Sequence, residues 1–141
     1  MSSHPNAAIA ARYYEECAND YGDPDKTRAM EAVDELLAPD FVLRYNGGRE
    51  DETMRGIDRH KQFLIDHTRS YQGERWTVEA VVADDRTVAC RWRLLATHAE
   101  TGNAIDLRAA DFFTVEDGRL TTLHRFLDFR TLEQQQRASS A

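Results

Sequence analysis

An aspartate and an arginine fall on adjacent predicted strands, at positions from which both side chains face the same interior wall. Residues 104–115 alternate between two faces, and the face that carries Asp111 is otherwise apolar. A charged group in that place costs free energy unless a partner compensates it. With a three-residue turn at positions 116–118, Arg125 on the next strand lies opposite Asp111. The sequence therefore predicts a cross-strand pair as the polar centre of an apolar pocket.

Three roles are open for this pair: a structural ion pair, a device that orients a ligand, or a general acid–base group. Tyr13, on a predicted helix, is expected within reach of it. A tyrosine hydroxyl there can stabilise negative charge on a substrate oxygen. Asp111, Arg125 and Tyr13 are therefore the candidate catalytic residues.

Other side chains are expected to form the pocket wall. Trp92 shares an inward strand face with Leu94, and an inward tyrosine can also donate a hydrogen bond to a ligand. The expected ligand-binding residues are Tyr45, Trp92, Leu94, Leu123 and Leu127.

No pattern predicts a metal or a cofactor. No glycine-rich phosphate loop follows a strand, and no His or Cys cluster has the spacing of metal ligands. His60 and His67 share a helix face without a carboxylate, and we interpret them as solvated or rim histidines. Cys17 and Cys90 form no CxxC pair and are interpreted as reduced core thiols. We predict a protein without metal, nucleotide or flavin.

The elements that must position these residues are helices first and strands afterwards. Helical spacing of apolar residues gives way to strict alternation along the chain. The expected helices cover 7–21, the stretch from Asp23-Pro24 to Pro39, and 56–71. The expected strands cover 41–45, 75–83, 86–98, 104–115 and 119–129, with an exposed acidic loop at 50–52 and a fraying polar tail at 131–141.

This order is typical of an α+β fold in which helices cover one sheet face. A chain of 141 residues, 41% hydrophobic and 30% charged, fits one domain, so we expect a single domain over 1–141 with an ordered core at about 7–132. The predicted architecture is a strongly curved antiparallel meander packed on three N-terminal helices.

Several strings resemble the nuclear transport factor 2-like superfamily, and especially its SnoaL-like branch. They are LLAPDFVLRYNG, RGIDRHKQFL, VACRWRLLATH, AADFFTVEDGRL and LHRFLDF, and the resemblance covers about residues 7–132. It implies the cystatin-like cone fold with a pocket for a small molecule. Because this fold hosts isomerases, cyclases, epoxide hydrolases and proteins without catalysis, the resemblance names no reaction.

The resemblance also implies which known catalytic sets are missing. The arginine and aspartate of limonene epoxide hydrolase fall on Trp92 and Leu94, and its last-strand aspartate falls on Arg125. The acid of SnoaL-type polyketide cyclases falls on Arg125 as well. Epoxide opening and ring closure by those acids are therefore not expected.

Ketosteroid isomerase is matched in part. Tyr13 falls on its helix tyrosine and Asp111 on its acid, whereas its base position falls on Tyr45. The chain thus resembles the family in scaffold and carries a different set of polar groups.

Charge and surface patterns predict the partners. A net charge of −7 and a pI near 5.2 do not predict a basic surface for binding nucleic acid. No secretion signal precedes the domain and no stretch approaches roughly 18 apolar residues, so we expect a cytoplasmic protein without membrane contact. Apolar residues on the outer sheet face predict a homodimer, as related proteins commonly pair through that face: Ala89, Ala110, Phe112 and Phe126.

Three functions remain open at this point. The first is a cofactor-free acid–base enzyme of isomerase, cyclase or hydrolase type, acting on a small, largely apolar carbonyl or hydroxyl compound. The second is a binding module in which Arg125 holds an acidic or carbonyl-bearing ligand. The third is a structural dimeric module with a closed interior. A cavity above roughly 300 Å³ favours the first two, and a filled interior favours the third.

Overall fold

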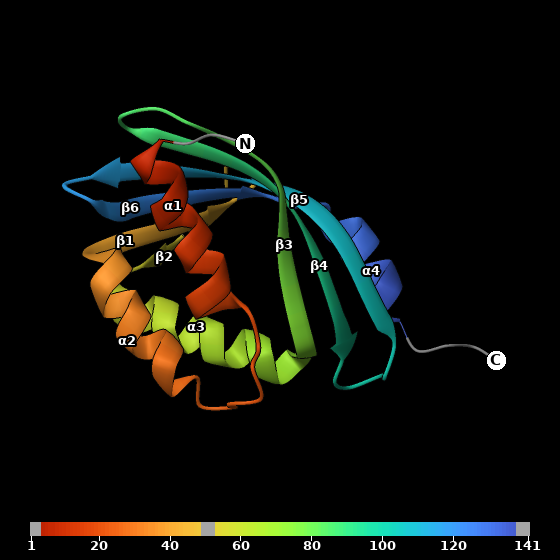
Figure 1. The fold of residues 1–141 in the computed structure, drawn as a ribbon. Coiled ribbons are helices and arrows are strands. Elements are labelled where there is room, and N and C mark those ends of the chain that lie inside the picture. The colour runs from red at the N-terminus through yellow and green to blue at the C-terminus, as the bar shows by residue number, and fades with distance from the viewer. Residues whose placement is uncertain (1–3, 49–52, 138–141) are drawn as a thin grey trace.

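A curved sheet wraps around three helices in the computed structural model, which describes residues 4–48 and 53–137 (Figure 1). The helices are α1 (Pro5–Arg12), the π-helix η1 (Tyr13–Ala18), α2 (Thr27–Leu36), α3 (Ile57–Ser70) and α4 (Phe129–Gln136). The strands are β1 (Leu37–Tyr45), β2 (Met54–Arg55), β3 (Tyr71–Ala83), β4 (Thr87–His98), β5 (Ala104–Glu116) and β6 (Arg119–Phe126). None of the helices in the described part of the chain has the length and apolar character needed to cross a membrane.

The sheet has the order β2-β1-β6-β5-β4-β3. Strands β3 to β6 form the predicted antiparallel meander, while β1 runs parallel to β6 and carries β2 on its other side. The predicted α+β cone is therefore confirmed. Helices α1, α2 and α3 lie inside the curve, and α4 lies outside it, behind β5 (Figure 1).

The turn between β5 and β6 is shorter than predicted. It has two residues, Asp117 and Gly118, both with positive φ (51° and 74°), which is the backbone of the tight turn that matches strand twist. Alone, this turn would send Arg125 to the outer face. The pairing skips Thr121, however, so a bulge adds the missing residue and Asp111 still pairs with Arg125. The prediction that Asp111 and Arg125 lie opposite each other on the inner face is right, and the prediction of a three-residue turn is wrong.

Two helix boundaries differ from the predictions. The first helix changes to a π-helix at Tyr13, which rotates the following side chains relative to a continuous α-helix. The second begins at Thr27 and not at Pro24, after Lys26 with φ 51°. The reason is Asp23, whose carboxylate accepts a hydrogen bond from the backbone nitrogen of Thr27 (2.8 Å) and closes a turn before the helix.

The C-terminal segment is ordered further than expected. Helix α4 starts after Asp128, which accepts a hydrogen bond from the backbone nitrogen of Thr131 (3.2 Å). Gln135 then pairs with the backbone of Asp106 on β5 in both directions (3.0 and 2.9 Å). The predicted fraying tail is thus wrong up to residue 136. The predicted acidic loop at 50–52 lies outside the described residues.

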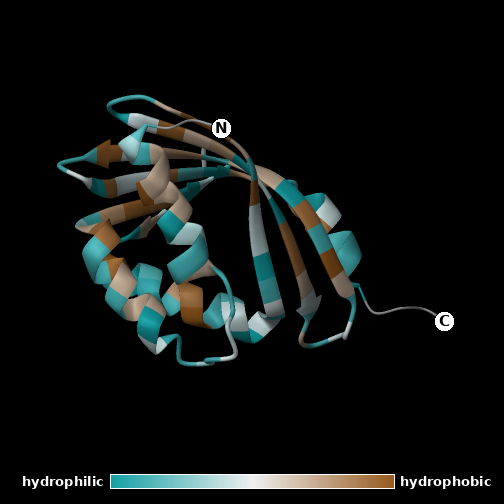
Figure 2. Cartoon of the chain, viewed as in Figure 1, coloured by the Kyte–Doolittle hydropathy of each residue, from teal (hydrophilic) through white to brown (hydrophobic). Residues whose placement is uncertain are grey.

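The core fills the inside of the curve. Apolar and polar residues alternate along the strands, so that one face of the sheet is buried and the other is exposed (Figure 2). Cys17 and Cys90 are free and buried, as predicted. The largest buried side chains include Trp92, Tyr13 and Arg125, which places a charged group in the centre of an aromatic core.

Candidate functional site

Asp111 and Arg125 form the predicted cross-strand pair. They are 0% and 2% exposed, and the guanidinium binds the carboxylate through two hydrogen bonds, Nε to Oδ1 (2.9 Å) and Nη2 to Oδ2 (3.0 Å). Burial disfavours the charge on Arg125, but the carboxylate of Asp111 holds the arginine pKa well above its usual range. Arg125 therefore stays charged at neutral pH.

The hydroxyl that reaches this pair belongs to Tyr14 and not to Tyr13. Tyr14 Oη donates to Asp111 Oδ2 (2.6 Å), so the carboxylate accepts three hydrogen bonds. Tyr13 Oη lies 2.8 Å from Nε2 of His60. Because consecutive residues of a helix point in different directions, the two adjacent tyrosines reach separate partners. Burial raises the pKa of both hydroxyls, which stay protonated.

His60 was expected at the rim and is buried instead. Its side chain is 1% exposed and packs on Phe41 and Phe63. Burial, with repulsion from Arg125, lowers the pKa of His60 to about 3. The rim interpretation is wrong, because α3 turns this histidine towards the sheet, where it stays neutral.

Two indole rings enclose the arginine. The guanidinium carbon of Arg125 lies 4.9 Å from the ring centroid of Trp76 and 5.1 Å from that of Trp92. The two rings are 4.3 Å apart. Such cation–π contacts stabilise a cation that has left water. Trp92 thus contacts Arg125 from the inner face of β4, and Trp76 makes a second such contact that the sequence interpretation omitted.

The remaining predicted wall residues do not all reach the centre. Leu94 and Leu123 are buried core residues, and Leu127 is half-buried at its edge. Tyr45 is also half-buried, with its ring 5.1 Å from that of Phe129. Burial raises the pKa of Tyr45, although the positive charge of Arg125 opposes the rise.

A second buried carboxylate was missed. Glu74 on β3 is 1% exposed; it accepts a hydrogen bond from Thr68 Oγ1 (2.6 Å), and its Oε2 lies 2.5 Å from Nδ1 of His67. Lys26 Nζ lies 3.7 Å from the same carboxylate. Strand alternation could have revealed Glu74. It lies two residues before the inward Trp76 and therefore shares its face once β3 begins at residue 71 rather than 75.

The Asp111–Arg125 pair and the group of side chains around Glu74 meet across a narrow void. Its lining includes Tyr13, Phe63, His67, Glu74, Trp76 and Arg125. The space between them admits no water-sized sphere, since aromatic side chains from η1, α3 and β3 meet there. The open apolar cavity expected at the Asp111–Arg125 pair is therefore closed within the described part of the chain.

Three buried polar atoms around this region lack a hydrogen-bond partner among the described residues. They are the indole Nε1 atoms of Trp76 and Trp92 and the Nδ1 atom of His60. Each indole nitrogen is a donor only. The site thus combines a buried cation, unpaired donors and a histidine held by a carboxylate, which together suit an oxygen-bearing molecule.

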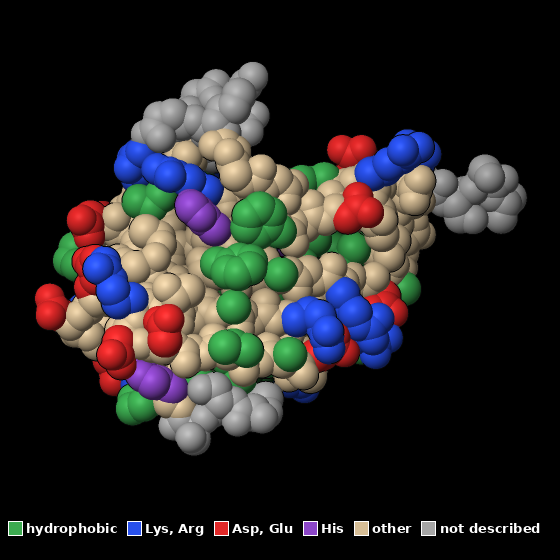
Figure 3. Space-filling view, turned by 90° about the horizontal axis from the view of Figure 1, so that it is seen from above, with side chains coloured by type: hydrophobic (Ala, Val, Ile, Leu, Met, Phe, Trp, Pro, Cys, Tyr) green, Lys and Arg blue, Asp and Glu red, His purple; other side chains and the backbone are tan. Residues whose placement is uncertain are grey.

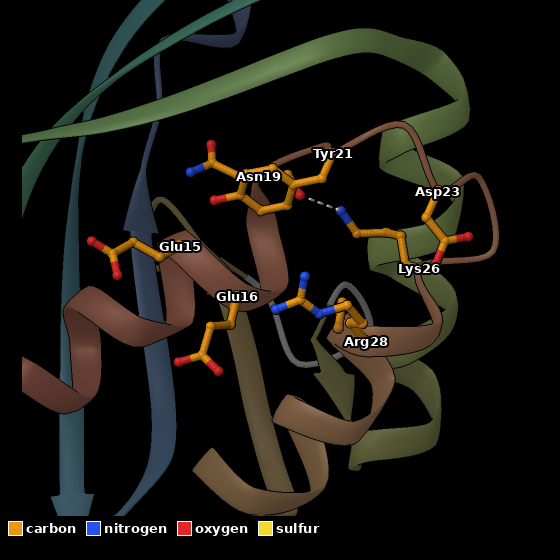
Figure 4. Close-up of a pocket in the computed structure, with 8 residues that line it drawn as sticks. Glu15, Glu16, Asn19, Tyr21, Asp23, Lys26 and Arg28 are labelled. Carbon is orange, nitrogen blue, oxygen red and sulfur yellow. Dashed lines mark hydrogen bonds between the residues drawn. The ribbon is translucent and has the colours of Figure 1, made fainter.

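Two larger hollows lie apart from this narrow void. One of about 480 Å³ separates α1 and η1 from β3, and one of about 360 Å³ lies beside Lys26. Figure 4 shows Lys26 reaching towards Asn19, whose carbonyl oxygen accepts a hydrogen bond from it (3.2 Å), while Glu15 and Glu16 point away. Burial lowers the pKa of Lys26. No group of three or more His, Cys, Asp or Glu side chains is placed to hold a metal within residues 4–48 and 53–137.

The outer sheet face carries exposed hydrophobic side chains. Phe112 and Phe126 are each 45% exposed and their rings stack edge to face at 5.7 Å, and Leu95 is 43% exposed. Hydrophobic side chains gather in the middle of the surface seen from above, beside histidine and basic groups (Figure 3). This is the face predicted to pair.

The comparisons with known proteins concern the whole fold. Residues 10–123 match the model of the SnoaL-like domain. A search of curated proteins gave no match. Solved structures with the same fold include a candidate polyketide cyclase from Acidithiobacillus ferrooxidans, with TM-score 0.79 and 21% identity over 99% of this chain and 100% of that one.

Two further structures resemble the chain in the same way. IdmH from Streptomyces antibioticus, named as a candidate polyketide cyclase, has TM-score 0.75 and 24% identity over 94% of this chain and 98% of that one. An LEH-like epoxide hydrolase from M. tuberculosis has TM-score 0.69 and 17% identity over 93% and 91%. At these identities the likeness concerns the fold alone.

Proposed function

Because this chain belongs to the SnoaL-like domain family, we propose that it binds a small, largely apolar carbonyl or hydroxyl compound inside the cone and moves a proton on it without a cofactor. The observation that carries the proposal is the set of unpaired donors around Arg125. A buried donor without a partner costs about 1–3 kcal/mol, and native proteins keep few of them. A ligand oxygen next to Arg125 offsets part of that cost.

Arg125 is the group that holds the ligand oxygen. Its Nε and Nη2 atoms are bound to Asp111, which fixes the plane of the guanidinium, and the side chain of Tyr45 forms a further hydrogen bond with Arg125. A preorganised cation of this kind stabilises negative charge that develops on a carbonyl oxygen. Asp111 already accepts three hydrogen bonds, so it is a positioning residue for Arg125 and not the base.

His67 is the group that takes the proton. With Nδ1 bound to Glu74, the imidazole presents Nε2, and the lining of the void brings it to the same space as Arg125. Glu74 holds the ring, as a carboxylate does for the histidine of other general bases. Tyr13 lines the void beside them, with its hydroxyl held at 2.8 Å from Nε2 of His60.

The experiment follows α-proton exchange of 2-tetralone in deuterated water by proton NMR. We expect exchange above the buffer rate, reduced at least about 100-fold by His67→Gln, because a positioned general base contributes a factor of that order. His124→Gln, on the outer side of β6, is the control and should retain the wild-type rate. Equal rates for the two variants, or no exchange above buffer, would contradict the proposal.

The second candidate is a non-catalytic module that pairs through the outer face of the sheet. The exposed, stacked rings of Phe112 and Phe126 favour it, since apolar surface of this kind usually has a partner. The closed interior is consistent with it as well. Pairing and an interior site are compatible, because they use opposite faces of the sheet.

A further inference from the structure

The groove of about 480 Å³ between α1–η1 and β3 has the character of a ligand site. Sites for small molecules have volumes of about 300–1,000 Å³ and mostly apolar walls. Ala7 and Ala11 leave space on the helix side, and Val78 and Val81 form the facing wall on β3. The aromatic ring of Tyr14 also lines this groove.

Trp76 separates this groove from the interior void. Among the described lining residues, it is the one that borders both spaces. On the interior side its ring lies over Arg125 (4.9 Å). A rotation of this one side chain therefore joins the groove to the space beside the buried cation.

Within the described part of the chain, the side chain of Trp76 is held by packing and not by a hydrogen bond. Its backbone nitrogen donates to Asn19 Oδ1 (2.6 Å), which fixes the strand at this point. The indole Nε1 has no hydrogen-bond partner among the described residues, and the ring is held by packing against Arg125 and against the rings of Trp92, His67 and Tyr14. The ring can thus move without breaking a hydrogen bond or shifting the strand.

We propose that the groove is the outer half of the ligand site and that the Trp76 indole is the partition between the two halves; this inference rests on the proposed function. The ligand it fits is a flat, uncharged ring compound with an oxygen at one end. The apolar walls take the rings, and the oxygen faces the Trp76 indole and Arg125. A carboxylate at the outer end is disfavoured, because Glu15 lines the groove there.

The test uses 1-naphthol and, as a matched probe without oxygen, naphthalene. Binding is followed by NMR through the indole N–H resonances of Trp76 and Trp92, the two tryptophans of the chain, assigned with Trp92→Phe. We expect 1-naphthol to shift both resonances and to bind about tenfold more tightly than naphthalene. Val81→Phe fills the groove and should weaken the binding of 1-naphthol about tenfold. Val82→Phe, at the neighbouring position that is 71% exposed, should leave the affinity for 1-naphthol unchanged.

The possible outcomes separate this inference from the proposed function. If 1-naphthol shifts the Trp92 resonance and Val81→Phe has no effect, the interior site stands and the groove is not part of it. If Val81→Phe abolishes binding but only the Trp76 resonance ever shifts, the groove is an isolated surface site and the partition is refuted. Equal loss in Val81→Phe and Val82→Phe also overturns the inference, since the effect is then not specific to the groove.

Discussion

Replacing Asp111 by asparagine tests whether the buried pair holds the fold together. The substitution removes the negative charge and places an amide donor against the donors of Arg125, which is 2% exposed and cannot reach water. Breaking a buried pair in this way costs about 3–5 kcal/mol. A domain of this size has a total stability of about 5–15 kcal/mol, so the loss is a large fraction of it.

Asp106 on the same strand provides the control. It binds Arg93 through two hydrogen bonds of 2.8 Å, the same geometry on the exposed face of the sheet. Solvent screens that pair, so Asp106→Asn should cost much less stability than Asp111→Asn. Urea denaturation at pH 7 measures both variants. If Asp111→Asn costs no more than Asp106→Asn, the reasoning on burial is refuted, and Asp111 is then held for function at little cost in stability.

The remaining predictions concern titration, a single hydrogen bond, assembly and metal content. Burial lowers the pKa of His60 from 6.5 to about 3, so the protein takes up a proton on unfolding between these pH values. The contribution of neutral His60 to stability is complete above pH 6.5 and falls by about 1.4 kcal/mol per pH unit between pH 6.5 and about 3. Urea melts of the wild type and of His60→Gln should differ in stability with this slope. Tyr14→Phe removes one hydrogen bond to a buried carboxylate and should cost about 1.5–3 kcal/mol in the same assay, whereas a cost near zero would mean that Asp111 does not need it. Sedimentation at micromolar concentration should give twice the 16.2 kDa of one chain, and Phe112→Arg should return it to a monomer; a wild-type monomer would refute pairing through this face. Metal analysis after dialysis should find no stoichiometric transition metal, and a retained ion would contradict that prediction.

Alternation along the strands determined much of this protein from its sequence. Asp111 and Arg125 were both predicted to face inwards and opposite each other, because side chains alternate with a period of two along a strand. The same pattern placed Trp92 on the inner face and the two phenylalanines Phe112 and Phe126 on the outer one. The order of helices and strands indicated the α+β class, and the resemblance to SnoaL-like proteins implied the cone.

Only the tertiary structure decided which side chains meet. Tyr14, and not Tyr13, reaches Asp111, because the packing of the first helix on the sheet sets which of two adjacent side chains points to the aspartate. The turn between β5 and β6 is one residue shorter than predicted, and the bulge at Thr121 adds one residue that was not predicted. The two differences cancel, so the predicted pairing of Asp111 with Arg125 is kept. His67 and Glu74 come together because α3 packs against β3, and the interior is closed because aromatic rings from three elements fill the same space. Sequence patterns report the period of each element by itself, whereas these contacts depend on how separate elements pack, and that is settled only when the whole core is filled.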